Sequence, residues 1–163
     1  MISGEALFRI RHRADQPFLI RVGNDQVQDL GTTFNLTREK DQVRVEVAEG
    51  AVRYRRGDSA LQLRAGQTLK VESEGDALVG RKTPRAIGAW SAGQLIYEGA
   101  PVAEVVEDLD RNLGVKVSVT PELALQEFTG AIDLRGQPET VIADFSSTIA
   151  ARARKTPDGW LIQ

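Results

Sequence analysis

The sequence lacks cysteine and has one histidine, and these two shortages exclude most side-chain chemistry. Without cysteine the chain has no thiol nucleophile, no disulfide and no cysteine-based zinc site. Ser-His-Asp triads and multi-histidine metal sites need imidazole groups that this chain barely supplies. His12 follows an alternating Phe-Arg-Ile-Arg run, which indicates a partly buried structural residue. No Asp-x-Asp-x-Asp loop is present. We therefore predict that the protein is not an enzyme and has neither a metal site nor a cofactor.

Long hydrophobic runs are also missing. The longest apolar runs span only a few residues, as at 6–8, whereas about 20 are needed to cross a bilayer. Residues 1–13 carry Glu5 and three arginines where a signal peptide needs an apolar core. Any targeting or anchoring segment is therefore expected to lie outside this chain. Apolar residues at 41% and charged residues at 27% indicate a folded protein of one large or two small domains.

The net charge of −2 divides unevenly along the 163 residues. Residues 1–88 hold 15 Lys+Arg and 12 Asp+Glu, a net of +3, whereas residues 89–163 hold 6 and 11, a net of −5. The first part repeats short alternating apolar runs between turn signals, at a spacing of about 8–12 residues that is typical of all-β domains. We predict an antiparallel β sandwich or roll over residues 1–80, with one buried face and one solvated, arginine-rich face.

The second part of the chain has a different pattern of apolar residues, prolines and glycines. Residues 81–88 are predicted to be a linker, and residues 89–163 a small α/β domain with a βαββαβ-like order. Pro101 suits the start of a helix, and Gly114 suits its end. Strands at 95–97 and 115–119 flank this helix and predict a compact βαβ unit; a strand at 128–132, a helix after Pro138 and a closing hairpin follow. This predicts two helices packed against one sheet. The expected core residues are Leu95, Val105, Leu109, Val117, Ile132, Phe145 and Ile149.

Four acidic side chains lie off the apolar stripe of the first predicted helix, and these are Glu104, Glu107, Asp108 and Asp110. They are either a solvated helix face or a surface that binds a basic partner. Exposed sheet edges in such a domain can also accept a strand from another protein. The arginines of the first part do not favour nucleic-acid binding, because interleaved acids neutralise them and aromatic residues are scarce on the same faces.

Several motifs in the chain resemble the FecR domain. The matching pieces run in order as Gly-Glu-Ala-Leu-Phe at 4–8, Gly-Thr-Thr-Phe-Asn-Leu at 31–36, Val-x-Val-x-Glu-Gly-x-Val at 45–52 and Leu-x-Ala-Gly-Gln at 63–67. From Ala89-Trp90 to Asp158-Gly159 the sequence resembles the secretin and TonB N-terminal-type domain that follows FecR in the same proteins. Each piece alone is a weak signal, but together and in this order they are specific.

The resemblance implies a role in cell-surface signalling. Members of the family are anti-sigma regulators of Gram-negative bacteria, in which a cytoplasmic segment binds an extracytoplasmic-function sigma factor and one helix crosses the inner membrane. The periplasmic part senses the signalling domain of an outer-membrane TonB-dependent receptor for siderophores. On this resemblance the present chain is the periplasmic sensor fragment of such a single-pass protein. A carbohydrate- or cell-wall-binding module is the alternative, although it usually displays more aromatic residues.

The resemblance also directs attention to the bond between Gly31 and Thr32, because some family members cleave themselves at this Gly-Thr step. A threonine hydroxyl can attack the preceding carbonyl carbon and move the acyl group from nitrogen to oxygen, and the resulting ester hydrolyses readily. Glycine assists because it has no Cβ and tolerates strained backbone. The alternative is that Gly31 and Thr32 form an ordinary turn that enters a strand.

Overall fold

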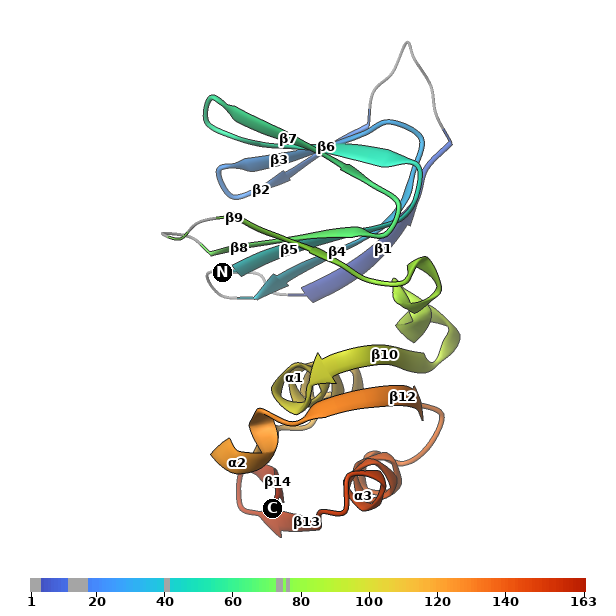
Figure 1. Cartoon of the computed structure of the whole chain (residues 1–163), viewed down its shortest axis with the longest axis vertical. Coiled ribbons are helices and arrows are strands. Elements are labelled where there is room, and N and C mark those ends of the chain that lie inside the picture. Colours follow the sequence, from blue (N-terminus) through green and yellow to red (C-terminus); the bar gives the residue numbers. More distant parts are fainter. Residues whose placement is uncertain (1–3, 12–17, 40–41, 73–74, 76) are drawn as a thin grey trace. The chain divides into compact units, whose positions relative to one another are not determined.

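The computed structural model describes residues 4–11, 18–39, 42–72, 75 and 77–163. The chain divides into two compact units, Met1–Gly88 and Ala89–Gln163. Figure 1 shows the helices and strands of each unit. The strands of the first unit are β1 (Gly4–Arg9), β2 (Leu19–Val22), β3 (Asp25–Asp29), β4 (Thr33–Glu39), β5 (Gln42–Glu49), β6 (Ala51–Arg56), β7 (Ser59–Arg64), β8 (Gln67–Glu72) and β9 (Ala77–Arg81).

The first unit is built from two antiparallel sheets. One has the strand order β1-β4-β5-β8-β9 and the other β2-β3-β6-β7, and they form separate layers in Figure 1. Strand β6 illustrates the pattern, because Val52 and Tyr54 are buried while Arg53 and Arg55 are exposed. The predicted antiparallel β architecture is confirmed. Its core consists of Val22, Val27, Phe34, Leu36, Val43, Val45, Val47, Val52, Tyr54, Leu63, Leu69 and Val71.

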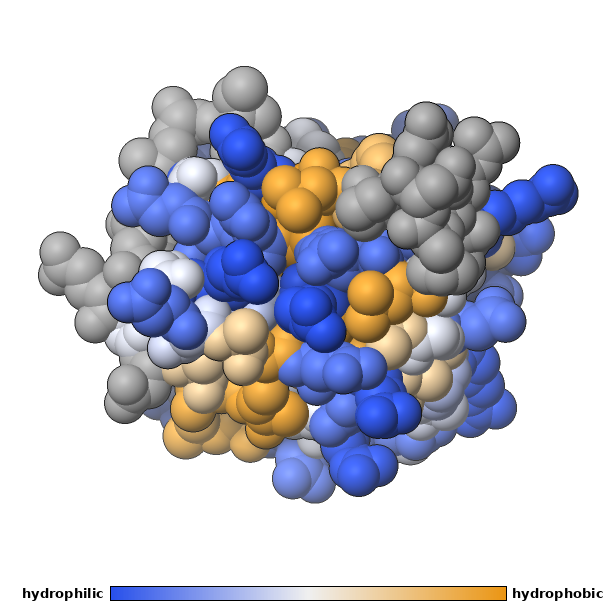
Figure 2. All heavy atoms as spheres, turned by 90° about the horizontal axis from the view of Figure 1, so that it is seen from above, coloured by the Kyte–Doolittle hydropathy of each residue, from blue (hydrophilic) through white to orange (hydrophobic). Residues whose placement is uncertain are grey.

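The outer faces of the two sheets differ. Hydrophilic residues cover most of the face seen in Figure 2, with hydrophobic groups in separate clusters between them. On the five-stranded sheet, by contrast, Asn35 and Glu46 are buried although they alternate with core residues. Lys82 forms an ion pair with Glu46 at 3.2 Å, and a short 3-10 helix, η1 (Pro84–Ala86), contacts β5. The segment at 82–88 therefore packs on the first unit and buries polar side chains there.

The second unit contains two small sheets and three α-helices among the described residues. Strand β10 pairs with β12 in antiparallel register, and β14 lies between β11, to which it is parallel, and β13. A 3-10 helix, η2 (Ala89–Ala92), opens the unit. The other elements are β10 (Gln94–Pro101), α1 (Val102–Leu113), β11 (Val117–Val119), α2 (Pro121–Ala124), β12 (Glu127–Asp133), α3 (Pro138–Thr148), β13 (Ala153–Thr156) and β14 (Gly159–Ile162).

The element types of this unit agree with the mixed α/β prediction, but their pairing does not. The predicted βαβ unit requires β10 and β11 in one sheet, whereas each joins a different sheet. The expectation of two helices against one sheet is wrong for the same reason, and it also missed α2. Hydrophobic periodicity gives the type of each element, but strand partners depend on contacts distant in sequence.

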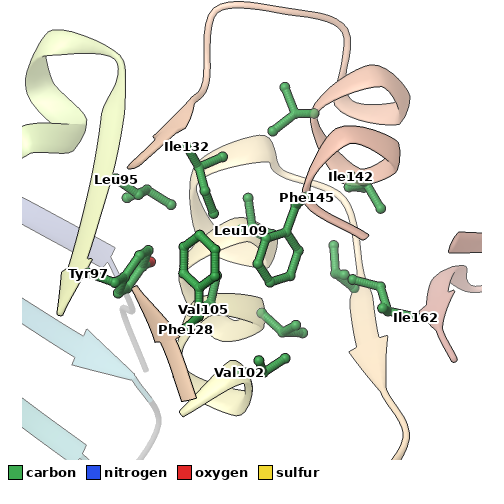
Figure 3. Packing of buried hydrophobic residues seen from close by; sticks show 13 residues of the cluster. Leu95, Tyr97, Val102, Val105, Leu109, Phe128, Ile132, Ile142, Phe145 and Ile162 are labelled. Atoms are coloured by element: carbon green, nitrogen blue, oxygen red, sulfur yellow. The ribbon is translucent and has the colours of Figure 1, made fainter. Parts of the chain in front are cut away.

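One cluster of hydrophobic residues joins the helices and sheets of the second unit. Figure 3 shows Phe128 between Tyr97 and Phe145, with ring centroids 5.9 and 5.3 Å from those two neighbours. Leu109 from α1 and Ile142 from α3 are fully buried in the same cluster. Six of the seven expected core residues are buried as predicted. Ile149 is only partly buried, because it lies one residue after the end of α3.

Helix α1 begins and ends at the residues that the sequence indicates. Pro101 is its N-cap residue, and Gly114 adopts a left-handed conformation with φ of 65° at its C-terminus. There the Gly114 N–H donates to the carbonyl of Asp110 at 3.1 Å. In the described part of the chain, no helix has the length and apolar character needed to span a bilayer.

Candidate cleavage site and partner-binding helix

The Gly31–Thr32 bond lies in the short connection between β3 and β4. Gly31 has φ of 91°, a left-handed backbone conformation that favours glycine. Its N–H donates to the side-chain Oδ2 of Asp29 at 2.9 Å. This aspartate-to-backbone hydrogen bond, two residues along the chain, is the usual way in which an aspartate stabilises a turn. The bond therefore follows a sharply turned glycine rather than an extended strand.

Thr32 is held on both sides where the chain passes from the four-stranded to the five-stranded sheet. Its side chain and backbone are 3% exposed. The Thr32 N–H donates to the Ile10 carbonyl at 3.2 Å, and the Ile10 N–H donates back at 3.0 Å. The Thr32 hydroxyl donates to the carbonyl of Ala51 at 2.6 Å. The nucleophile that self-cleavage requires is therefore buried and fixed in one orientation.

The carbonyl of Gly31 packs directly on another glycine. A Cβ placed on Gly50 would lie 2.1 Å from the Gly31 oxygen, far inside any real contact, and Gly50 itself has φ of 78°. The Glu-Gly-x-Val motif is thereby explained, because only glycine leaves room for the peptide bond that follows Gly31. Two motifs that are distant in the sequence meet at this bond.

Sequence reasoning did not single out Asp29, which is the buried acid of this turn. Asp29 is 5% exposed, and its Oδ1 is buried without a hydrogen-bond partner among the described residues. An aspartate two residues before a glycine in a turn is a signal that could have identified it. Its burial and its open oxygen depend on the packing of the two sheets.

The four acidic residues predicted for partner binding do not share one environment. Glu107 is exposed, Glu104 and Asp110 are half-buried, and Asp108 is 5% exposed. Asp108 therefore faces the interior rather than the polar side of α1. The helical stripe drawn from apolar residues alone could not reveal this, because the buried face of α1 includes a charged residue.

Asp108 belongs to a buried polar group of the second unit. The Tyr97 hydroxyl donates to Asp108 Oδ2 at 2.8 Å, and Arg111 forms an ion pair with Oδ1 one helical turn later. The amide of Asn112 donates to the Asp108 carbonyl at 2.9 Å. Burial and the Asp108 carboxylate raise the pKa of Tyr97. This arrangement links α1 to β10, so the buried position of Asp108 has a structural explanation.

A cavity of about 270 Å³ lies in the first unit, between residues of β6, β7 and the end of β8. Its lining includes Tyr54 and Arg56 beside apolar side chains. Arg56 is bound to Asp25 at 2.7 and 2.8 Å, so its charge is already neutralised. Burial and the nearby Asp25 raise the pKa of Tyr54. The described residues contain no cluster of acidic or histidine side chains that could hold a metal ion, and His12 lies outside them.

Comparison with known proteins supports the family resemblance. A family model described as FecR protein matches residues 1–53. Two crystal structures, both described as "a putative anti-sigma factor from Parabacteroides distasonis ATCC 8503", match the fold with TM-scores of 0.78 and 0.76. Each is 24% identical and covers 98% of this chain, which in turn covers 77% and 76% of theirs. No curated protein matches the chain significantly.

The N-terminal part of this chain is thus similar to the FecR family. Over nearly its whole length the chain also has the fold of the two bacterial structures. The predicted FecR resemblance is confirmed, and the antiparallel unit followed by the small α/β unit agrees with it.

Proposed function

We propose that this chain is the periplasmic sensor region of a membrane-anchored anti-sigma regulator. The observation that carries the proposal is the FecR match over residues 1–53, joined to a fold shared over 98% of the chain with a structure described as an anti-sigma factor. In this proposal the second unit is of the secretin and TonB N-terminal type. Its partner is the signalling domain of a TonB-dependent siderophore receptor, and a segment outside this chain reaches the extracytoplasmic-function sigma factor.

The second unit offers two means of binding such a domain. Strands β10 and β12 form a two-stranded sheet, and β11 and β13 are the outer strands of the other sheet, so backbone groups at sheet edges can pair with an added strand. The unit also has a net charge of −5. Glu104, Glu107 and Asp110 contribute to a surface that suits a basic partner, whereas Asp108 supports the helix from within.

Surface plasmon resonance with purified signalling domains of TonB-dependent receptors, which measures both binding and association rate, tests this proposal. We expect one receptor domain to bind the 163-residue chain, and Glu107→Lys to slow association several-fold because a charge at an interface rim acts mainly on the association rate. Glu139→Lys on α3, which is exposed as well, is the matched control and should leave that rate unchanged. The wild-type rate should fall as salt rises above about 0.1 M.

One result would contradict the sensor proposal, and another would contradict only the role of its acidic surface. Binding to glycans with no binding to any receptor domain would favour the carbohydrate-binding alternative. An association rate that is insensitive to salt would remove the role of the acidic surface while leaving strand pairing as the mode of binding.

We also propose that the chain cleaves itself between Gly31 and Thr32. The left-handed Gly31, the buried hydroxyl of Thr32 and the glycine contact at Gly50 support this. Cleavage should not separate the two pieces. Strand β1 pairs with β4 and β3 pairs with β6, so strands before the bond are hydrogen-bonded to strands after it.

Self-cleavage is therefore measured under denaturing conditions. Wild-type protein should give one peak in gel filtration but two bands on a denaturing gel, and mass spectrometry should find new ends at Gly31 and Thr32. Thr32→Ser, which retains a hydroxyl, should also be cleaved, and Thr32→Ala should remain one band. If wild type and Thr32→Ala both stay intact through long incubation, the proposed cleavage is wrong.

A further inference from the structure

Asp29 is a buried carboxylate beside the bond for which self-cleavage is proposed. It ends strand β3 and is 5% exposed. Its backbone N–H donates to the carbonyl of Phe18 at 2.9 Å, and its Oδ2 accepts the N–H of Gly31 at 2.9 Å. The residue is thus anchored through its backbone and through one carboxylate oxygen. Its second oxygen, Oδ1, is buried and has no hydrogen-bond partner among the described residues.

The same strand contains a second buried aspartate for comparison. Asp25 is 4% exposed, and Arg56 donates to both of its oxygens at 2.7 and 2.8 Å. Both carboxylate oxygens of Asp25 therefore accept hydrogen bonds, whereas only one of those of Asp29 does. A buried polar atom left unpaired is unfavourable, and more so when it is charged. Asp29 lies two residues before Gly31, and a buried atom without a partner, such as its Oδ1, calls for an explanation.

The acyl shift needs a proton acceptor that the Thr32 hydroxyl does not have in the resting structure. That hydroxyl donates to the Ala51 carbonyl at 2.6 Å, and an amide carbonyl is far too weak a base to take the proton. Among the residues that the structure describes, two carboxylates lie near the turn: that of Asp29 and that of Glu49, which is opposite Thr33 in the β4–β5 register. Glu49 is exposed, whereas Asp29 is buried and touches Gly31 directly.

The geometry points to Asp29 as the proton acceptor for the Thr32 hydroxyl, an inference that rests on the proposed self-cleavage. In the reaction Oδ1 of Asp29 takes the hydroxyl proton while Oγ1 of Thr32 forms a bond to the carbonyl carbon of Gly31. The carbon–nitrogen bond then breaks, and its electron pair stays on the Thr32 nitrogen, which takes the proton back from Asp29. Water hydrolyses the resulting ester to the Gly31 carboxylate and a free Thr32 hydroxyl.

The other charged groups around this turn differ from Asp29 in their exposure to solvent. They come from the ends of β1, β5, β6 and β7, and all of them are exposed in the described structure: Arg9, Arg11, Glu49, Arg53 and Arg64. Because solvent screens exposed charges, these groups act on the buried Asp29 carboxylate only weakly.

Asp29→Asn tests this inference. The variant keeps an oxygen that accepts the Gly31 N–H, so the turn is retained, but it cannot take a proton. We expect its cleavage rate to fall by about 100-fold or more, the range typical of a lost general base. Asp25→Asn is the matched control, since it also removes a buried carboxylate from β3, and its cleavage rate should remain that of wild type. Circular dichroism melts of both variants verify that they fold.

One further readout separates proton transfer from a merely structural role. Neutral hydroxylamine, which attacks esters, should hasten wild-type cleavage and leave a hydroxamate on Gly31. It should have little effect on Asp29→Asn, in which formation of the ester is slow and limits the rate.

The outcomes distinguish this inference from the cleavage proposal. Wild-type protein that is cleaved, with Asp29→Asn cleaved equally fast, would overturn the role of Asp29 and leave self-cleavage standing. Equal slowing in Asp29→Asn and Asp25→Asn would also overturn it, because the rate would then follow fold stability. A folded wild-type chain that stays intact through long incubation would overturn both.

Discussion

Replacing Gly50 with alanine should destabilise the first unit far more than the same replacement at Gly57. Both glycines have positive φ, 78° and 54°, so alanine costs about 1–2 kcal/mol at either position for the left-handed conformation. They differ in their surroundings. The new Cβ at Gly57 meets nothing within 4 Å, whereas at Gly50 it lies 2.1 Å from the Gly31 oxygen. Overpacking of this kind adds about 1–3 kcal/mol.

The expected losses are therefore about 2–5 kcal/mol for Gly50→Ala and about 1–2 kcal/mol for Gly57→Ala. Urea unfolding followed by far-UV circular dichroism measures both. Both tryptophans, Trp90 and Trp160, lie in the second unit, so their fluorescence follows that unit separately. Gly57→Ala controls for the backbone conformation, and the difference between the variants isolates the contact with Gly31.

Equal destabilisation by the two substitutions would refute this reasoning. It would mean that the Gly31 carbonyl does not rest on Gly50 in solution, or that the turn moves away at no cost. The proposed geometry of the Gly31–Thr32 bond would then lose its main support.

Three further predictions concern the second unit. Asp108→Ala should cost about 2–3 kcal/mol in urea unfolding because Tyr97 and Arg111 lose a buried partner, and Glu107→Ala, at an exposed site, should stay within about 0.5 kcal/mol of wild type. Leu109→Ala should cost about 2–5 kcal/mol, whereas Leu125→Ala, at a residue 84% exposed, should be nearly neutral; similar losses would contradict the core in Figure 3. Because Tyr97 has a raised pKa, the unfolded chain releases its proton near pH 10 while the native chain keeps it. With respect to this group, stability should therefore be constant below pH 10 and fall above it by about 1.4 kcal/mol per pH unit. Tyr97→Phe should lose less stability above pH 10 than wild type does. The same alkaline slope in both proteins would contradict this prediction.

Much of the local structure followed from the sequence because local rules decide it. Alternation predicted the buried and exposed sides of β6, where Val52 and Tyr54 point inward. Proline and glycine gave the ends of α1, since Pro101 needs no hydrogen bond there and Gly114 can take a positive φ. The order of the FecR motifs was also visible, and the family match over residues 1–53 agrees with it.

Pairing and burial of polar residues could not be predicted in the same way. The βαβ interpretation failed because β11 pairs with β14, which is about forty residues away, rather than with β10. Asp108 was counted with the polar side of α1, but Tyr97 on another element makes its burial favourable by donating a hydrogen bond. The spacing of Asp29 from Gly31 is typical of a turn, but nothing local indicates that this aspartate is buried.

The sequence by itself determined what this protein cannot use and which motifs it contains. The absence of cysteine and the single histidine removed whole classes of chemistry, and the spacing of apolar residues fixed the types of its elements. Only the tertiary structure brought Asp29, Gly50 and Ala51 to the Gly31–Thr32 bond. The physical reason is that chemistry between side chains requires distances of a few ångströms, and residues far apart in sequence reach such distances only when sheets pack.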